Sequence, residues 1–282
     1  MRFVSFSAGE IDSWGLVTAE GIRSLGELER VGRHGLRETI RSQGLSKVLE
    51  EQSSAPLRQL TEVTLHTPIV DPEKVICVGL NYADHIAEMG RPTPEYPVIF
   101  TRFSDSFVAH GSPLTAPRNS SQFDYEGELA VVIGKTAHHV TAQSAMEHVF
   151  GYTILNDGSI RDYQRHTHQF APGKNFPKSG SFGPEIVTSE EFGAITNQSI
   201  RTRVNGEVVQ DSDLSQLVFG VAELIAYCSE WTILQPGDII ATGTPGGVGD
   251  SRDPKLWLFP GDVVEVEIEG IGTLLNQVAD ER

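Results

Sequence analysis

The chain has 282 residues, of which 39% are hydrophobic, so it is long enough to bury a sizeable core. Its 38 acidic residues outnumber its 22 basic residues and give a formal net charge of −16, with no stripe of basic residues. Such a charge repels phosphate backbones, so nucleic-acid binding is not expected. An anionic substrate would need a local cation, and a bound metal ion is one way to supply it.

The cysteines and the first residues bear on the cellular compartment. Cys77 and Cys228 lie far apart within apolar runs, which favours two buried free thiols over a disulfide. The N-terminus has no apolar core of signal-peptide length, and no later run approaches a membrane span. We therefore expect a cytoplasmic protein that does not enter a membrane.

Residues 1–66 are expected to form a small N-terminal α/β module. Apolar residues at 3–6 predict a strand, which residues 14–17 continue as a hairpin. Between residues 25 and 51 the chain is charged, and its apolar residues follow roughly helical spacing. A larger domain, residues 67–282, follows.

In the larger domain, strand signals outnumber helix signals. Asn205-Gly206 predicts a hairpin turn, because both residues favour positive φ. One helix is predicted at residues 214–229 from an apolar face that ends at Cys228. The elements do not alternate as in a doubly wound sheet, so we expect a β-rich α+β fold. Strands are predicted at residues 74–78, 128–133, 152–155, 200–204, 207–210, 239–242 and 263–268.

Three carboxylates form a candidate metal site. Glu126 and Glu128 are two residues apart at the start of a predicted strand, so their side chains share one face. Asp157, at the end of the next predicted strand, can supply a third oxygen. Oxygen ligands without Cys or His favour a hard ion, Mg²⁺ or Mn²⁺. The alternative is a solvated strand face, which a Glu-x-Glu pattern favours when it is taken alone.

A candidate general base lies before this site. His85 and Glu88 are three residues apart and would be neighbours on a helical turn. A histidine oriented by a carboxylate is a competent base. Residues 90–97 are rich in proline and typical of a loop that closes over a site. The alternative is an exposed ion pair.

Further polar residues follow Asp157. Arg161 and Gln164 lie one helical turn apart and could hold a substrate carboxylate or carbonyl, and Lys174 could place a cation beside an enolate. The alternative for all three is a solvated surface position. Residues 242–249 are Gly-rich, and their backbone N–H groups could bind an anionic oxygen. They lack the Lys-Ser/Thr ending of a phosphate-binding loop, so nucleotide binding is not supported.

Taken together, these motifs resemble the fumarylacetoacetate hydrolase family. The likeness spans roughly residues 74–280, and several motifs in one order are more specific than any one of them. The matching segments are VGLNYADHIAE at 78–88, FDYEGELAVVIGK at 123–135, NDGSIRDYQ at 156–164, GK at 173–174, GP at 183–184, PGDIIATGTP at 236–245 and PGD at 260–262.

The resemblance implies a mixed β-roll or sandwich domain, usually in a homodimer, and a small anionic keto-acid substrate. It also implies roles for individual residues. Glu126, Glu128 and Asp157 would hold Mg²⁺ or Mn²⁺; His85, Glu88 and Lys174 would be catalytic, with His85 and Glu88 on a lid; Arg161, Gln164, Tyr82 and Thr244 would bind the substrate.

The implied activity is hydrolysis of a carbon–carbon bond in an acylpyruvate, such as maleylpyruvate or fumarylpyruvate, during aromatic catabolism. The metal would polarise the substrate, His85 would activate water, and Lys174 would stabilise the leaving pyruvate enolate. The alternative is an oxaloacetate decarboxylase or a 2-hydroxymuconate-type isomerase or decarboxylase, because the same electron sink serves those reactions. A non-catalytic binding protein is disfavoured, because none of the motif residues has been replaced.

Overall fold

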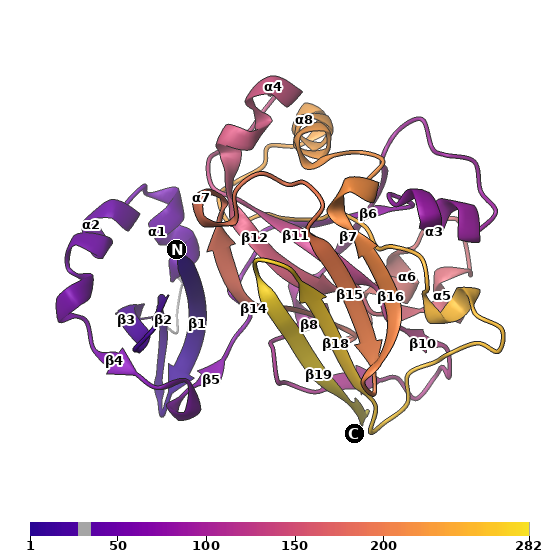
Figure 1. The fold of residues 1–282 in the computed structure, drawn as a ribbon, viewed down its shortest axis with the longest axis horizontal. Helices are drawn as coiled ribbons and strands as arrows, with labels where there is room; N and C mark the ends of the chain where they lie inside the picture. Colours follow the sequence, from indigo (N-terminus) through magenta and orange to yellow (C-terminus); the bar gives the residue numbers. More distant parts are fainter. Residues whose placement is uncertain (28–34, 282) are drawn as a thin grey trace.

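The computed structural model describes residues 1–27 and 35–281, and a twelve-stranded sheet runs through most of it (Figure 1). In spatial order its strands are β4 (Leu57–Arg58), β3 (Gly21–Glu27), β2 (Ile11–Thr18), β1 (Arg2–Ala8), β14 (Gly180–Thr188), β12 (Val149–Asn156), β11 (Gly127–Ile133), β17 (Ile239–Ala241), β6 (Val75–Gly79) and β7 (Val98–Arg102); β5 (Thr64–Leu65) pairs with β1, and β8 (Phe107–Val108) pairs with β14.

A second sheet packs on the large sheet (Figure 1). Its five strands are, in order, β16 (Glu207–Asp213), β15 (Ser199–Val204), β18 (Val263–Ile268), β19 (Gly272–Asp280) and β9 (Leu114–Ala116). A separate ribbon joins β10 (Phe123–Asp124) to β13 (Ser159–Ile160).

Helices are short and lie between the strands. The α-helices are α1 (Leu36–Arg41), α2 (Leu45–Glu50), α3 (Ala83–Glu88), α4 (Ala142–Ala145), α5 (Arg161–Gln164), α6 (Ala171–Lys174), α7 (Ser189–Phe192) and α8 (Val221–Trp231). The 3₁₀ turns are η1 (Gln52–Ser54), η2 (Leu60–Glu62), η3 (Ser104–Ser106), η4 (Met146–His148), η5 (Leu214–Gln216) and η6 (Gly249–Ser251). In the described part of the chain, no helix is long and apolar enough to cross a membrane.

The main core lies between the two sheets. Leu129 and Val131 of β11 pack in one buried cluster with Val266 of β18 and Leu274 of β19. Gly127 allows the close approach, because a Cβ there would lie 2.3 Å from Thr202 Oγ1 in the opposite sheet. The β-rich α+β sandwich predicted from the sequence is therefore confirmed.

The N-terminal segment joins the same large sheet. Strands β1, β2 and β3 form an antiparallel meander, and β1 also pairs with β14, where Arg2 lies opposite Val187. Arg2 reinforces this junction through an ion pair with Glu185, with Nη1 2.5 Å from Oε1. Helices α1 and α2 agree with the helical spacing after residue 35, whereas residues 28–34 lie outside the described residues. The domain division at residue 66 stays a prediction.

The predicted strands and hairpin are confirmed, but the long helix is shorter than predicted. Asn205 and Gly206 have φ of 53° and 81° at the turn between β15 and β16. The helix begins at Val221 and not at Leu214, because Glu223 accepts the Gly220 N–H at 2.8 Å and caps the helix there. Cys77 and Cys228 are buried free thiols, as expected.

Candidate active site

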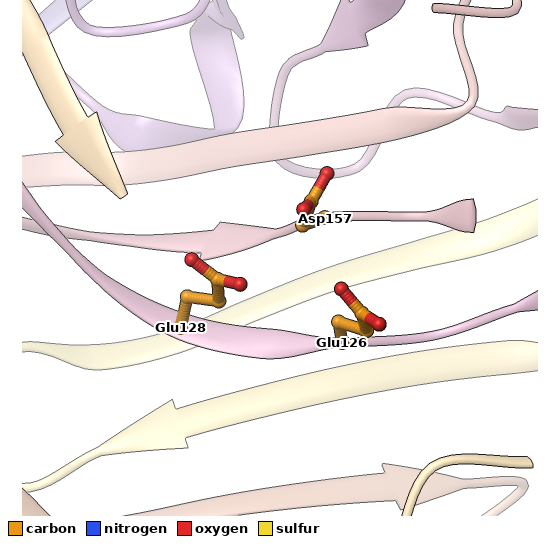
Figure 2. A group of neighbouring side chains, drawn as sticks. All are labelled: Glu126, Glu128 and Asp157. Atoms are coloured by element: carbon orange, nitrogen blue, oxygen red, sulfur yellow. The ribbon is translucent and has the colours of Figure 1, made fainter. Parts of the chain in front are cut away.

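The three predicted carboxylates meet at one end of the large sheet. Glu126 and Glu128 flank Gly127 at the start of β11, and Asp157 follows the last residue of β12, where Gly127 pairs with Asn156. Both glutamates point to the same side of β11, toward Asp157 (Figure 2). Each residue offers one oxygen, and these oxygens lie within 4.8 Å of one another. All three side chains are buried, so the solvated-face alternative is excluded.

Buried cations hold two of these three carboxylates. Lys174 Nζ lies 2.5 Å from Glu126 Oε2 and 2.7 Å from Asp157 Oδ2. Arg161 Nη2 lies 2.6 Å from Glu126 Oε1. Among the described residues, Glu128 forms no ion pair, and it accepts the Gly243 N–H at 2.9 Å.

The two glutamates therefore differ in pKa. Burial alone would raise the pKa of Glu126, but Lys174 and Arg161 outweigh burial and lower it to about 2. Burial, followed by the charges of Asp157 and Glu126, raises the pKa of Glu128 well above its usual range. A buried carboxylate beside two others is unfavourable unless a cation neutralises it. The negative charge of Glu128 is therefore not balanced by a neighbouring cation among the described residues.

This donor set fits a hard divalent cation. It consists of carboxylate oxygens alone, which Mg²⁺ and Mn²⁺ prefer. A divalent ion there would also supply the positive charge that Glu128 lacks. Glu126, Glu128 and Asp157 are the residues that would hold it.

A pocket of about 350 Å³ opens over the glutamates. Its apolar walls include Phe100 and Phe170, which pack edge to face with ring centroids 5.7 Å apart. Its polar lining is formed by Glu126, Glu128, His85, Arg91, Arg161, Gln164, Arg165, Thr167, His168, Lys174, Thr244 and Asp250. This pocket brings together seven of the ten site residues predicted from the sequence, and Asp157 lies buried behind it.

The predicted histidine–carboxylate pair lies on α3 beside the pocket. His85 lines the pocket, and its Nδ1 is 3.5 Å from Glu88 Oε2. Glu88 accepts the Gly247 N–H at 3.1 Å and the Ser251 hydroxyl at 2.6 Å. The Gly-rich loop thus uses its backbone N–H groups as predicted, but the anions that it binds are carboxylates of this chain.

The remaining predicted substrate residues fall into two groups. Gln164 and Thr244 line the pocket; Gln164 accepts a hydrogen bond from Arg161 Nη1 at 2.9 Å, and Thr244 donates to Gly127 O at 2.9 Å. Tyr82 does not line the pocket. Its side chain is fully buried in the core between the sheets, so the structure does not place it where the resemblance implied.

Two functional neighbours were not predicted from the sequence. Arg102, at the end of β7, donates from Nη1 to Asp157 Oδ1 at 2.6 Å. Asp124 accepts from Arg161 Nε at 2.8 Å and from the Gly249 and Asp250 N–H groups, so it fixes Arg161 to the Gly-rich loop. Asp124 lies inside a matching motif, which was a usable signal, whereas nothing local marks Arg102.

Two relatives from different organisms are named for the same activity. The human protein "Oxaloacetate tautomerase FAHD2A, mitochondrial" is 44% identical over 225 residues, which is 79% of this chain and 72% of that protein. "Oxaloacetate tautomerase YisK" of Bacillus subtilis is 44% identical over 223 residues, 78% of this chain and 74% of that protein.

Solved structures share the whole fold. A putative HpcE protein from Mycobacterium smegmatis has a TM-score of 0.87 at 34% identity, and maleylpyruvate hydrolase from Sphingobium sp. SYK-6, in complex with manganese(II) and pyruvate, has 0.84 at 26%; both matches cover 100% of each chain. Residues 74–279 match the fumarylacetoacetate (FAA) hydrolase C-terminal domain, which includes every site residue described above. The chain therefore belongs to the fumarylacetoacetate hydrolase family.

Proposed function

We propose that this chain interconverts the enol and keto forms of oxaloacetate, with Mg²⁺ or Mn²⁺ held by Glu126, Glu128 and Asp157. The observation that carries the proposal is its 44% identity to oxaloacetate tautomerases over a stretch as long as the catalytic domain. This reaction belongs with the isomerase alternative considered from the sequence, and the relatives support it better than hydrolysis.

The reaction needs stabilised negative charge on the oxygen at C2. The bound ion would supply positive charge that stabilises the carboxylate and the enolate oxygen of the substrate. Lys174 and Arg161 are buried cations that line the same pocket, so they add to this stabilisation where water is excluded.

The reaction also moves one proton. In the enol-to-keto direction the O–H bond at C2 breaks and a C–H bond forms at C3. We assign the transfer at C3 to His85, because it lines the pocket and has a carboxylate partner, Glu88, to orient its ring. His168 also lines the pocket, but among the described residues it has no such partner.

Oxaloacetate carries a second carboxylate, and the pocket offers a cation for it. Arg161, Arg165 and Lys174 each form an ion pair with a carboxylate of the chain. Arg91 also lines the pocket, and within the described residues it forms no ion pair. Gly90 has φ of +62°, and the Arg91 N–H donates to Ile86 O, so a glycine-capped helix end fixes the Arg91 backbone relative to His85. Arg91 is thus the group that we expect to bind the distal carboxylate.

A second candidate is hydrolysis of an acylpyruvate, the reaction expected from the sequence. It is favoured by the likeness to maleylpyruvate hydrolase over the full chain and by the His85–Glu88 pair, which can activate water. Tautomerisation uses the same pair for proton transfer alone, so it makes the smaller chemical demand.

The experiment is a direct enol assay. Oxaloacetate enol absorbs in the ultraviolet, and its decay is followed with purified protein in Mn²⁺, in Mg²⁺ and in a chelator. We expect metal-dependent acceleration of enol decay without pyruvate release. Enol decay at the uncatalysed rate in every metal condition would refute the proposal.

A further inference from the structure

We propose that Arg102 is a positioning residue for the metal site: it holds Asp157 so that one carboxylate oxygen faces the other two ligands. The inference rests on the metal site of the proposed function and not on the reaction that the site performs.

Arg102 is a buried cation with a complete set of partners. Its side chain is 0% exposed. Nη1 donates to Asp157 Oδ1 at 2.6 Å and to Gly158 O at 3.0 Å. Nη2 donates to Ser179 Oγ at 2.8 Å, and Nε donates to Ser106 Oγ at 3.1 Å. All three nitrogens are therefore committed, and the guanidinium has one orientation.

The surrounding fold is shaped to hold the guanidinium. The Arg102 Cζ atom lies 4.4 Å from the centre of the Phe107 ring, which is typical of a cation–π contact. A Cβ at Gly180 would lie 2.8 Å from both Nη1 and Nη2, so only glycine leaves room on that side. Strands β7, β8 and β14 thus build a closed socket for one side chain.

The two oxygens of Asp157 have different partners. Oδ1 accepts from Arg102, whereas Oδ2 faces Lys174, which also binds Glu126. Arg102 therefore binds Oδ1, and Oδ2 is left on the side of Lys174 and the carboxylate cluster. Hydrogen-bonded partners of metal ligands orient the ligand, and their loss typically weakens metal affinity about 10- to 100-fold.

A buried positive charge also repels a metal ion, so two effects of opposite sign compete. If orientation dominates, removing Arg102 weakens metal binding; if repulsion dominates, removing it strengthens binding. We infer that orientation dominates, because without Arg102 the buried Oδ1 has no cation to hold it.

The test measures Mn²⁺ binding by calorimetry and electron paramagnetic resonance, with the melting temperature of the metal-free protein recorded for each variant. Arg102→Met should raise the Mn²⁺ Kd about 10- to 100-fold. Arg102→Lys keeps the charge but only one donating nitrogen in place of three, so it should recover part of the affinity. Gly180→Ala keeps Arg102, but the new methyl group would displace the guanidinium, so this variant should also raise the Mn²⁺ Kd. If Arg102→Met does not fold, the Mn²⁺ Kd values of Arg102→Lys and Gly180→Ala test the proposal.

Lys74→Met is the matched control, because Lys74 is paired to Asp238 away from the pocket. It should lower the melting temperature and leave Kd unchanged. A folded Arg102→Met protein with wild-type or tighter Mn²⁺ binding would overturn the proposal, as would unchanged Kd in both Arg102→Lys and Gly180→Ala. Wild-type protein that binds no Mn²⁺ would instead contradict the metal site itself.

Discussion

The two ends of the pocket are built differently. At the carboxylate end, Glu126, Asp157, Lys174 and Arg102 are buried and joined by ion pairs of 2.5–2.7 Å. At the other end, His85 stands on α3, a helix of six residues, and the longer contact of 3.5 Å joins it to Glu88.

This difference separates metal binding and charge stabilisation from proton transfer. The carboxylate end has one arrangement, because each buried charge there depends on its partner. At the α3 end, Glu88 is held by hydrogen bonds from Gly247 N–H and the Ser251 hydroxyl, and we expect this proton-transfer pair to differ between relatives without disturbing the metal site. Relatives named for tautomerisation and for hydrolysis fit this division. Four substitutions test it.

The largest effect is expected for Asp157→Ala. It removes a metal ligand. It also removes the carboxylate with which both Arg102 and Lys174 are paired in the wild type, and leaves Lys174 with Glu126 alone. Metal binding and catalysis should be lost, and the metal-free protein should lose about 3–5 kcal/mol of unfolding free energy. Chemical denaturation and calorimetry with Mn²⁺ measure both. A stable variant that still binds Mn²⁺ would contradict the ligand assignment.

Glu128→Gln should abolish metal binding without that loss of stability. Glu128 forms no ion pair among the described residues, so its neutralisation leaves no cation unpaired, and it relieves repulsion from Asp157 and Glu126. We expect a metal-free melting temperature equal to or above that of the wild type. A clear drop would mean that the charge of Glu128 is already compensated.

His85→Ala acts at the α3 end. It should lower kcat by about 10²–10⁴-fold, the usual range for a general acid or base, while the Mn²⁺ Kd stays within twofold of wild type. Stopped-flow enol decay and calorimetry provide the two readouts. An equal loss of metal affinity would show that the two ends are not independent.

Arg91→Gln should have the smallest effect. An exposed arginine contributes modestly to binding a carboxylate, so KM for oxaloacetate should rise about fivefold with little change in kcat. Arg165→Gln is the matched control on the rim, because Arg165 is already paired with Asp250. Equal effects of the two substitutions would remove the special role of Arg91.

Local periodicity placed candidate side chains together, and the resemblance to the family supplied their roles. Glu126 and Glu128 share a face because side chains alternate along a strand, and Asp157 joins them because β11 and β12 are neighbours in sequence and in the sheet. His85 and Glu88 follow from helical spacing in the same way.

Long-range pairing accounts for what could not be predicted. Arg102 reaches Asp157 across 55 positions of the chain, through strands whose order no local pattern reveals. Tyr82 stands three residues before His85, yet it precedes the first turn of α3 and its side chain enters the core. The start of α8 depended on one glutamate that caps Gly220 and not on the apolar face.

The most direct test of the proposed function compares substrates in one experiment. Mn²⁺-loaded protein is mixed separately with oxaloacetate, maleylpyruvate and fumarylpyruvate, and enol absorbance and pyruvate release are recorded together. We predict rapid enol loss from oxaloacetate without pyruvate release, and a kcat/KM for this step above that for cleavage of either acylpyruvate. Faster pyruvate release from maleylpyruvate or fumarylpyruvate than enol loss from oxaloacetate would contradict the assignment and make the chain a hydrolase.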